Sequence, residues 1–315
     1  MFNIDPIPSQ KNYLNVRVYR TSNSTINNWD RVTLEFYLKD RLITNAYYVN
    51  GLQLDSERLI RNIPIPANTL SIKLNHFGDF NISSVSLEKD RTITDFESKL
   101  ISEQLDCYNG QFFFNYPSKL PPRKLIVTLP GMGNNIDINS QHALMTMQSF
   151  PFKEDVYRLH LVDFFWANGS CLIFDENNRY NIDNIISIID SILVNNNISP
   201  SECHIITASK GCFAGYEIMQ RKQYKFAFFA PITNVAKFNE NSPVFRFTSR
   251  EMINKGYKFA KPNFLKNATV YTSLKDPGIE LGLLSECLHT IDQNLMHSQI
   301  TKHFMGQYLS SENII

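Results

Sequence analysis

Hydrophobic and polar residues alternate with a period of two between about residues 12 and 90. The alternation is clearest over residues 14–18, 32–38 and 70–74, and it continues less strictly over residues 82–87. Strands with one buried and one exposed face produce this period, and polar segments rich in turn-forming residues separate the four stretches. No convincing long helix interrupts them. We therefore expect a small antiparallel β-sandwich.

Continuous apolar runs replace the alternation after about residue 106. The runs read LIVTL, HLVDFF, CHII, FAFFA and ATVY, and they occupy residues 125–129, 160–165, 203–206, 226–230 and 268–271. Strands that are apolar on both faces are typical of the centre of a parallel sheet that helices cover.

Two helices are predicted among these strands. Residues 181–195 carry isoleucines at helical spacing on one face, and Ile300, Phe304 and Tyr308 share a face of a final helix. Strands that alternate with helices predict an α/β fold with a mainly parallel sheet and helices on both faces. The chain has 315 residues, more than one compact core usually holds. We expect two domains, a β-sandwich in residues 1–105 and the α/β domain in residues 106–315.

Composition excludes several classes of function. The formal net charge of +1 provides no electrostatic footprint for nucleic acid or for an anionic membrane. The segment MFNIDPIPSQ lacks the features of a signal peptide, and no apolar run is long enough to span a bilayer. Five scattered cysteines without CxxC spacing indicate reduced thiols. We expect a cytoplasmic protein without a metal site or a bound cofactor, since histidine pairs at metal-binding spacing, a P-loop and GxGxxG are all missing.

The segment CHIITASKGCFAGYEIM contains the candidate nucleophile, Ser209. A strand leads into T-A-S-K-G and then into a stretch with helical character and small residues, which is the layout of a nucleophile elbow. Gly211 provides the small residue needed after the serine, whereas Thr207 stands where that layout prefers glycine. A second interpretation is a serine that caps a helix in an ordinary strand-to-helix turn.

A nucleophilic serine needs a base and an orienting carboxylate, which follow it along the chain in enzymes with this elbow. Asp276 comes just after the run ATVYTS, and His297 immediately precedes the predicted closing helix. We expect these two residues to serve Ser209. His289 is the serious rival as base and Asp292 as acid, and spacing alone excludes neither of them. His303 lies inside the closing helix, where it is expected to pack or to face solvent.

The oxyanion hole should combine the main-chain N–H after the nucleophile with one from the loop after an earlier strand. These criteria select Lys210 and the loop P-G-M-G-N-N, in which Gly131 or Met132 is the natural donor. The side chain of Lys210 is expected to be solvated or to contact an anionic substrate.

With these residues in place, residues 106–315 resemble the α/β-hydrolase superfamily. More narrowly, this part of the chain resembles bacterial serine O-acetyltransferases. Three features carry the resemblance: L-P-G-M-G-N after a strand, a T-x-S-K-G elbow, and a late histidine before a helix. Those enzymes modify capsular polysaccharides or the glycans of accessory-secretion adhesins, and the adhesin-modifying members also carry a preceding β-sandwich. The resemblance implies transfer of acetyl from the co-substrate acetyl-CoA, through acetyl-Ser209, to a hydroxyl of a polysaccharide or glycan acceptor.

Two other functions fit the sequence. A carboxylesterase or carbohydrate deacetylase would use the same residues with water as acceptor. A non-catalytic module would instead bind a glycan or a protein partner, and the stretches AYYVN and QFFFNYP contain aromatic residues that can stack on sugars, although such clusters more often belong to strands or cores.

Overall fold

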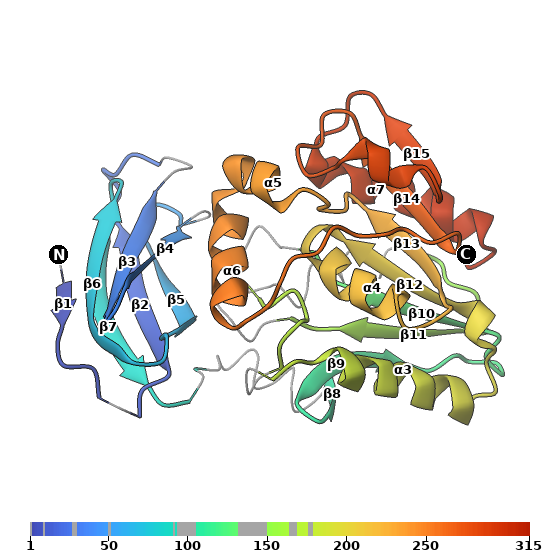
Figure 1. The fold of residues 1–315 in the computed structure, drawn as a ribbon, viewed down its shortest axis with the longest axis horizontal. Helices are drawn as coiled ribbons and strands as arrows, with labels where there is room; N and C mark the ends of the chain where they lie inside the picture. Colours follow the sequence, from blue (N-terminus) through green and yellow to red (C-terminus); the bar gives the residue numbers. More distant parts are fainter. Residues whose placement is uncertain are drawn as a thin grey trace.

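The fold is known from a computed structural model (Figure 1). It describes residues 2–8, 10–26, 30–49, 52–90, 92, 105–131, 150–163, 169–175 and 179–315. None of the helices in these ranges is long and apolar enough to cross a membrane.

The N-terminal part contains two antiparallel sheets, drawn in blue to cyan in Figure 1. One sheet has the order β1-β6-β3-β4 and consists of Phe2–Ile4, Thr69–Phe77, Arg31–Leu38 and Leu42–Tyr48. The other has the order β5-β2-β7 and consists of Ser56–Pro64, Tyr13–Arg20 and Asn81–Glu88. Alternate residues of both sheets, such as Val16 and Leu34, are fully buried in one shared core. The predicted β-sandwich is confirmed.

The remaining strands form one mixed sheet, which has eight strands within the described residues. Its order is β15-β14-β13-β12-β10-β11-β9-β8. In chain order β8 to β15 span Leu105–Tyr108, Gln111–Tyr116, Lys124–Leu129, Val156–Leu161, Cys203–Ala208, Lys225–Phe229, Ala268–Ser273 and Leu288–Asp292. The six strands from β15 to β11 are parallel, and β9 and β8 add an antiparallel edge. β10 lies between β11 and β12, so the strand order reverses there, beside the strand that ends at the candidate nucleophile.

Helices cover both faces of this sheet. The described α-helices are α3 (Ile182–Asn195), α4 (Cys212–Met219), α5 (Val235–Asn241), α6 (Pro243–Asn254) and α7 (His297–Ser311). Successive residues of one strand point to opposite faces: Ile205 of β12 packs with residues of α3 and α4, whereas Ile206 packs with residues of α7. Burial on both sides explains why these strands are continuous apolar runs, and the predicted α/β fold class is confirmed.

Several elements differ from the sequence expectations. The run at residues 160–165 contributes only its first two residues to a strand, because β11 spans Val156–Leu161. Helices α5 and α6 were not predicted. The first described strand of the large sheet, β8, begins at Leu105, and the division into domains at residues 1–105 and 106–315 remains a prediction.

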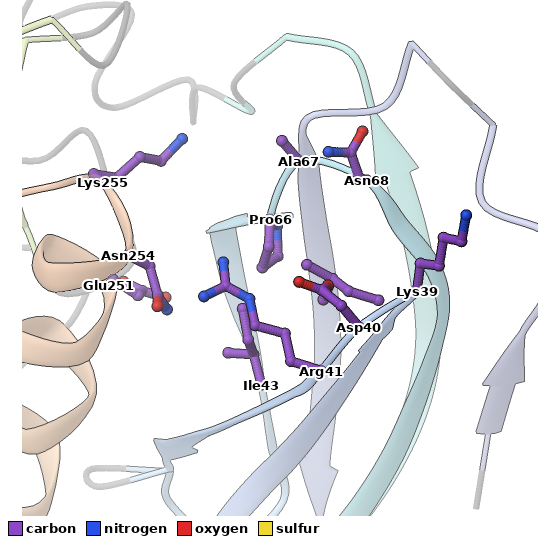
Figure 2. A pocket seen from close by; sticks show the side chains of 11 residues that line it. Lys39, Asp40, Arg41, Ile43, Pro66, Ala67, Asn68, Glu251, Asn254 and Lys255 are labelled. Atoms are coloured by element: carbon purple, nitrogen blue, oxygen red, sulfur yellow. The ribbon is translucent and has the colours of Figure 1, made fainter.

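Helix α6 lies between the sandwich and the large sheet (Figure 1). Tyr47 of β4 donates a hydrogen bond to Glu251, and Arg250 donates one of 3.3 Å to the carbonyl of Thr44. Beside these contacts is a pocket of about 520 Å³. Figure 2 shows Arg41 of the β3–β4 turn facing the last turn of α6 across this pocket.

Candidate active site

Ser209 stands directly after β12 with φ of +49°, the left-handed region that residues with a side chain rarely adopt. The chain then forms one 3₁₀ turn, η3 (Ser209–Gly211), and continues as α4. A non-glycine residue in such a conformation costs about 1–3 kcal/mol and persists only where its surroundings fix it. A strained serine between a central strand and a helix is the geometry of a nucleophile elbow, and not of an ordinary helix cap.

Glycine is required where the elbow meets the loop after β10. A Cβ atom on Gly211 would overlap the carbonyl oxygen of Leu129 and lie 2.7 Å from that of Pro130. A Cβ atom on Gly131 would lie 3.3 Å from the carbonyl oxygen of Ala208. The two segments that are expected to supply the oxyanion donors are therefore in close backbone contact.

Thr207 occupies the elbow position that normally holds glycine, and the structure shows how it fits. Its side chain is fully buried, and its hydroxyl lies 3.1 Å from Cys212 Sγ. The space for its methyl group comes from Gly215 of α4, where a Cβ atom would lie 2.6 Å from Thr207 Cγ2 and 3.0 Å from Phe228 Cε1. The small residue at this contact is therefore Gly215 on the helix, where the usual pattern has a glycine on the strand. The bulkier Thr207 fits on the strand because of it.

Three sequence-predicted side chains meet at this elbow. Nε2 of His297 lies 2.8 Å from Oγ of Ser209, and Nδ1 of His297 lies 3.0 Å from each carboxylate oxygen of Asp276. Asp276 is buried, and its Oδ1 also accepts a 2.8 Å hydrogen bond from the N–H of Gly278. An ionised carboxylate accepts only, so Nδ1 donates to it and Nε2 is left with the lone pair that can take the serine proton.

The imidazole of His297 is partly exposed. Its side chain is 21% exposed, whereas that of Asp276 is fully buried. Phe238 of α5 packs against the imidazole with ring centroids 4.7 Å apart. The same phenyl ring lies close to Gly278, where a Cβ atom would be 2.8 Å from Phe238 Cδ2. This apolar cover keeps water away from the histidine–carboxylate contact, which strengthens the contact. Phe238 was not singled out in the sequence, because α5 was not predicted.

The rival residues are occupied elsewhere. His289 is an exposed residue of edge strand β15, and its Nδ1 lies 3.1 Å from the carbonyl oxygen of Cys287. His303 is exposed on α7, in line with expectation. Asp292 accepts hydrogen bonds of 2.6 and 2.7 Å from the main-chain N–H groups that follow it. His297 itself is the first residue of α7 and does not precede it.

The nearby thiol of Cys212 is a poor nucleophile. Burial raises the pKa of this thiol well above its ordinary value, so it stays protonated at neutral pH. It also lies inside α4, whereas Ser209 is at the turn. Ser209 Oγ, in contrast, lies 2.8 Å from His297 Nε2.

Two of the three residues expected to supply oxyanion donors, Lys210 and Gly131, lie within the described residues. Lys210 directly follows Ser209 in the elbow, and Gly131 lies against Ala208. Met132 is outside the described residues.

The expectation for the side chain of Lys210 is wrong. It is neither solvated nor turned toward a substrate, because it is fully buried and forms an ion pair of 2.7 Å with Asp163. Sequence reasoning missed Asp163, although one signal was present: it is the only charged residue between the two hydrophobic halves of HLVDFF.

No protein-family model matches the sequence, and no curated protein sequence matches it. Among solved structures, a capsule O-acetyltransferase of Neisseria meningitidis serogroup A is similar at 14% identity and a TM-score of 0.47, over 66% of this chain and 93% of that one. A chain of the glycosylation-associated protein complex of Streptococcus agalactiae is similar at 13% identity and a TM-score of 0.44, over 99% of this chain and 64% of that one. A carboxylesterase of Lactobacillus plantarum is similar at 9% identity and a TM-score of 0.44, over 67% of this chain and 98% of that one.

Because these likenesses are distant, the fold assignment rests on the strand order and on the elbow. Six parallel strands with the order reversed at β10, a strained serine after β12 and a histidine after the last strand define one architecture. The chain has the α/β-hydrolase fold.

Proposed function

We propose that this protein is a serine acyltransferase that forms an acyl-enzyme on Ser209. The contact that carries the proposal is the 2.8 Å approach of His297 Nε2 to Ser209 Oγ, with Asp276 3.0 Å from the other ring nitrogen. A strained serine, a base within hydrogen-bond reach and a buried carboxylate behind that base are the parts that nucleophilic acyl transfer requires.

In the first half-reaction, Ser209 Oγ attacks the carbonyl carbon of an acetyl thioester while His297 Nε2 takes the hydroxyl proton. The resulting oxyanion accepts hydrogen bonds from the main-chain N–H groups of Lys210 and of Gly131 or Met132. The carbon–sulfur bond then breaks, the proton passes from the imidazolium to the leaving thiolate, and acetyl-Ser209 remains. Asp276 holds the ring orientation and stabilises the imidazolium while it exists.

In the second half-reaction, an acceptor hydroxyl attacks the acetyl-Ser209 carbonyl and gives its proton to His297. The same oxyanion donors act again, and the ester bond to Ser209 breaks as the serine oxygen recovers a proton from the imidazolium. The products are an acetylated acceptor and the regenerated serine.

We infer the donor and the acceptor from the sequence resemblance. The motifs L-P-G-M-G-N and T-x-S-K-G favour acetyl-CoA as co-substrate and a hydroxyl of a bacterial surface polysaccharide or glycan as acceptor. Acetyl-CoA is an intracellular metabolite, so this proposal implies a cytoplasmic reaction.

Hydrolysis is the second candidate, with water in place of the acceptor. The partial exposure of His297, at 21% of its side chain, favours it because solvent can reach the base. A carboxylesterase or a carbohydrate deacetylase would use the same acyl-enzyme.

The test is the release of CoA from acetyl-CoA by the purified chain, followed with a thiol reagent, with and without a polysaccharide acceptor. Faster release with the acceptor, together with an acetylated polysaccharide, supports transfer. Equal rates and free acetate indicate hydrolysis. If the unaltered chain is active and Ser209→Ala releases CoA as fast, the serine mechanism is wrong. If neither chain releases CoA faster than the protein-free blank, a non-catalytic binding role is the better explanation.

A further inference from the structure

The residue after the candidate nucleophile sends its side chain into the protein interior. Nζ of Lys210 lies 2.7 Å from Oδ2 of Asp163, and both side chains are fully buried. Asp163 follows β11 by two residues, on the far side of β10 from the elbow. The ion pair thus joins the chain after β11 to the chain after β12, the two strands that flank β10.

The surrounding chain is shaped to this pair. Gly169 has φ of +74°, and a Cβ atom there would overlap Lys210 Nζ and lie 2.5 Å from Asp163 Oδ2. Oδ1 of Asp163 accepts a 2.7 Å hydrogen bond from the N–H of Ser170 and lies 3.3 Å from its hydroxyl. Both oxygens of the carboxylate are therefore engaged, one by the cation and one by the segment that covers it.

Stability alone is a weak reason for such an arrangement. Burying two charges costs desolvation that their attraction often fails to exceed, and well-packed neutral residues frequently serve as well. A buried ion pair does, however, fix the relative position of two backbone segments. If either side chain moved away, the other charge would remain buried without a partner, which is costly. Such fixation is needed here, since Ser209 is held at a φ of +49°.

We propose that Lys210 and Asp163 form a positioning pair that orients the main-chain N–H of Lys210 toward the oxyanion. An oxyanion donor must be aimed at the transition state before the reaction begins, and a small rotation of the Lys210 peptide would remove that aim. The side chain of the same residue anchors that peptide. This inference rests on the proposed acyl-enzyme function of Ser209.

The test is the neutral double variant Asp163→Asn with Lys210→Met, which removes both charges and so leaves no buried charge unpaired. The rates of acylation by p-nitrophenyl acetate and by acetyl-CoA are measured, together with the thermal midpoint and the far-UV circular dichroism. Loss of one oxyanion donor lowers kcat by about 10²–10³, so misorientation should lower it about 10- to 100-fold. KM should stay unchanged, because the oxyanion exists only in the transition state.

A matched control is available in the sandwich. Arg20 and Asp30 form another buried ion pair of 2.7 Å, with side chains 1% and 2% exposed. The double variant Arg20→Met with Asp30→Asn removes an equivalent pair far from the elbow in sequence, and it should leave kcat unchanged. A fall in kcat in both double variants would overturn the inference, because it would show a general loss of order.

The two proposals fail in different ways. If the unaltered chain is not acylated at Ser209, the proposed function fails and the positioning role fails with it. If the unaltered chain is acylated and the folded Asp163/Lys210 double variant reacts at the same rate, only the positioning role is wrong. Should the double variant fail to fold, Asp163→Glu decides, because it keeps both charges but moves the carboxylate relative to Lys210 Nζ. Its kcat should fall several-fold at constant KM, and an unchanged kcat would overturn the inference.

Discussion

Replacing Gly215 by alanine tests whether α4 packs against β12 as tightly as the structure indicates. The new Cβ atom would lie 2.6 Å from Thr207 Cγ2 and 3.0 Å from Phe228 Cε1, and both neighbours are fully buried. Overpacking costs about 1–3 kcal/mol, and such close contacts with buried strand residues place this site near the upper value. Alanine gains about 1 kcal/mol over glycine in a helix. The net loss is about 2 kcal/mol, or about 4–8 °C in the thermal midpoint by calorimetry.

Two further variants sharpen this prediction. Thr207→Ser deletes the methyl group that the new Cβ atom meets while keeping the hydroxyl, so it should recover about 1 kcal/mol of the loss in the double variant. Gly306→Ala in α7 is the control, since its Cβ atom would lie 3.4 Å from the nearest atom, Phe150 Cε1, and should stabilise the chain by about 0.5–1 kcal/mol. Additive losses in the double variant, or a Gly215→Ala chain as stable as the unaltered one, would refute the packing argument.

Three other outcomes are expected. Asp276→Asn should keep the fold but lower kcat by about 10⁴ in an ester assay, because the amide no longer holds the proton of His297 on Nδ1; a loss below tenfold would contradict this role. Gly169→Ala should destabilise the chain in urea melts more than an exposed glycine change, since its Cβ atom would overlap Lys210 Nζ. Burial lowers the pKa of His204 to about 4 from 6.5, so only the unfolded chain binds this proton between those values. As pH falls through this interval, the free energy of unfolding should therefore decrease by about 1.4 kcal/mol per pH unit, and His204→Asn should flatten this slope.

The sequence predicted the parts of the fold whose signal is local. The buried central strands appear as apolar runs, and the elbow follows one of them with small residues in order. Helix α6 gives a weaker signal because it packs against β4 of the sandwich, and that partner surface comes from a distant part of the chain. A periodic pattern identifies a face but not what covers it.

The same difference between local signals and distant contacts applies to the residues of the candidate site. Ser209, Asp276 and His297 could be selected because each follows or precedes a recognisable element. Spacing did not decide between His297 and His289, whose difference is that β15 is an edge strand that leaves His289 exposed. Asp163 was visible as a charge within an apolar run, but its pairing with Lys210 depends on β10 lying between their two strands.

Intact-protein mass spectrometry after brief exposure to acetyl-CoA or to p-nitrophenyl acetate tests the central claim most directly. We expect one added acetyl group, mapped by peptide analysis to Ser209 and absent from Ser209→Ala. Rapid acid quenching preserves the adduct even if water removes it quickly. An acetyl group that persists in Ser209→Ala, or that maps to another residue, would contradict the account.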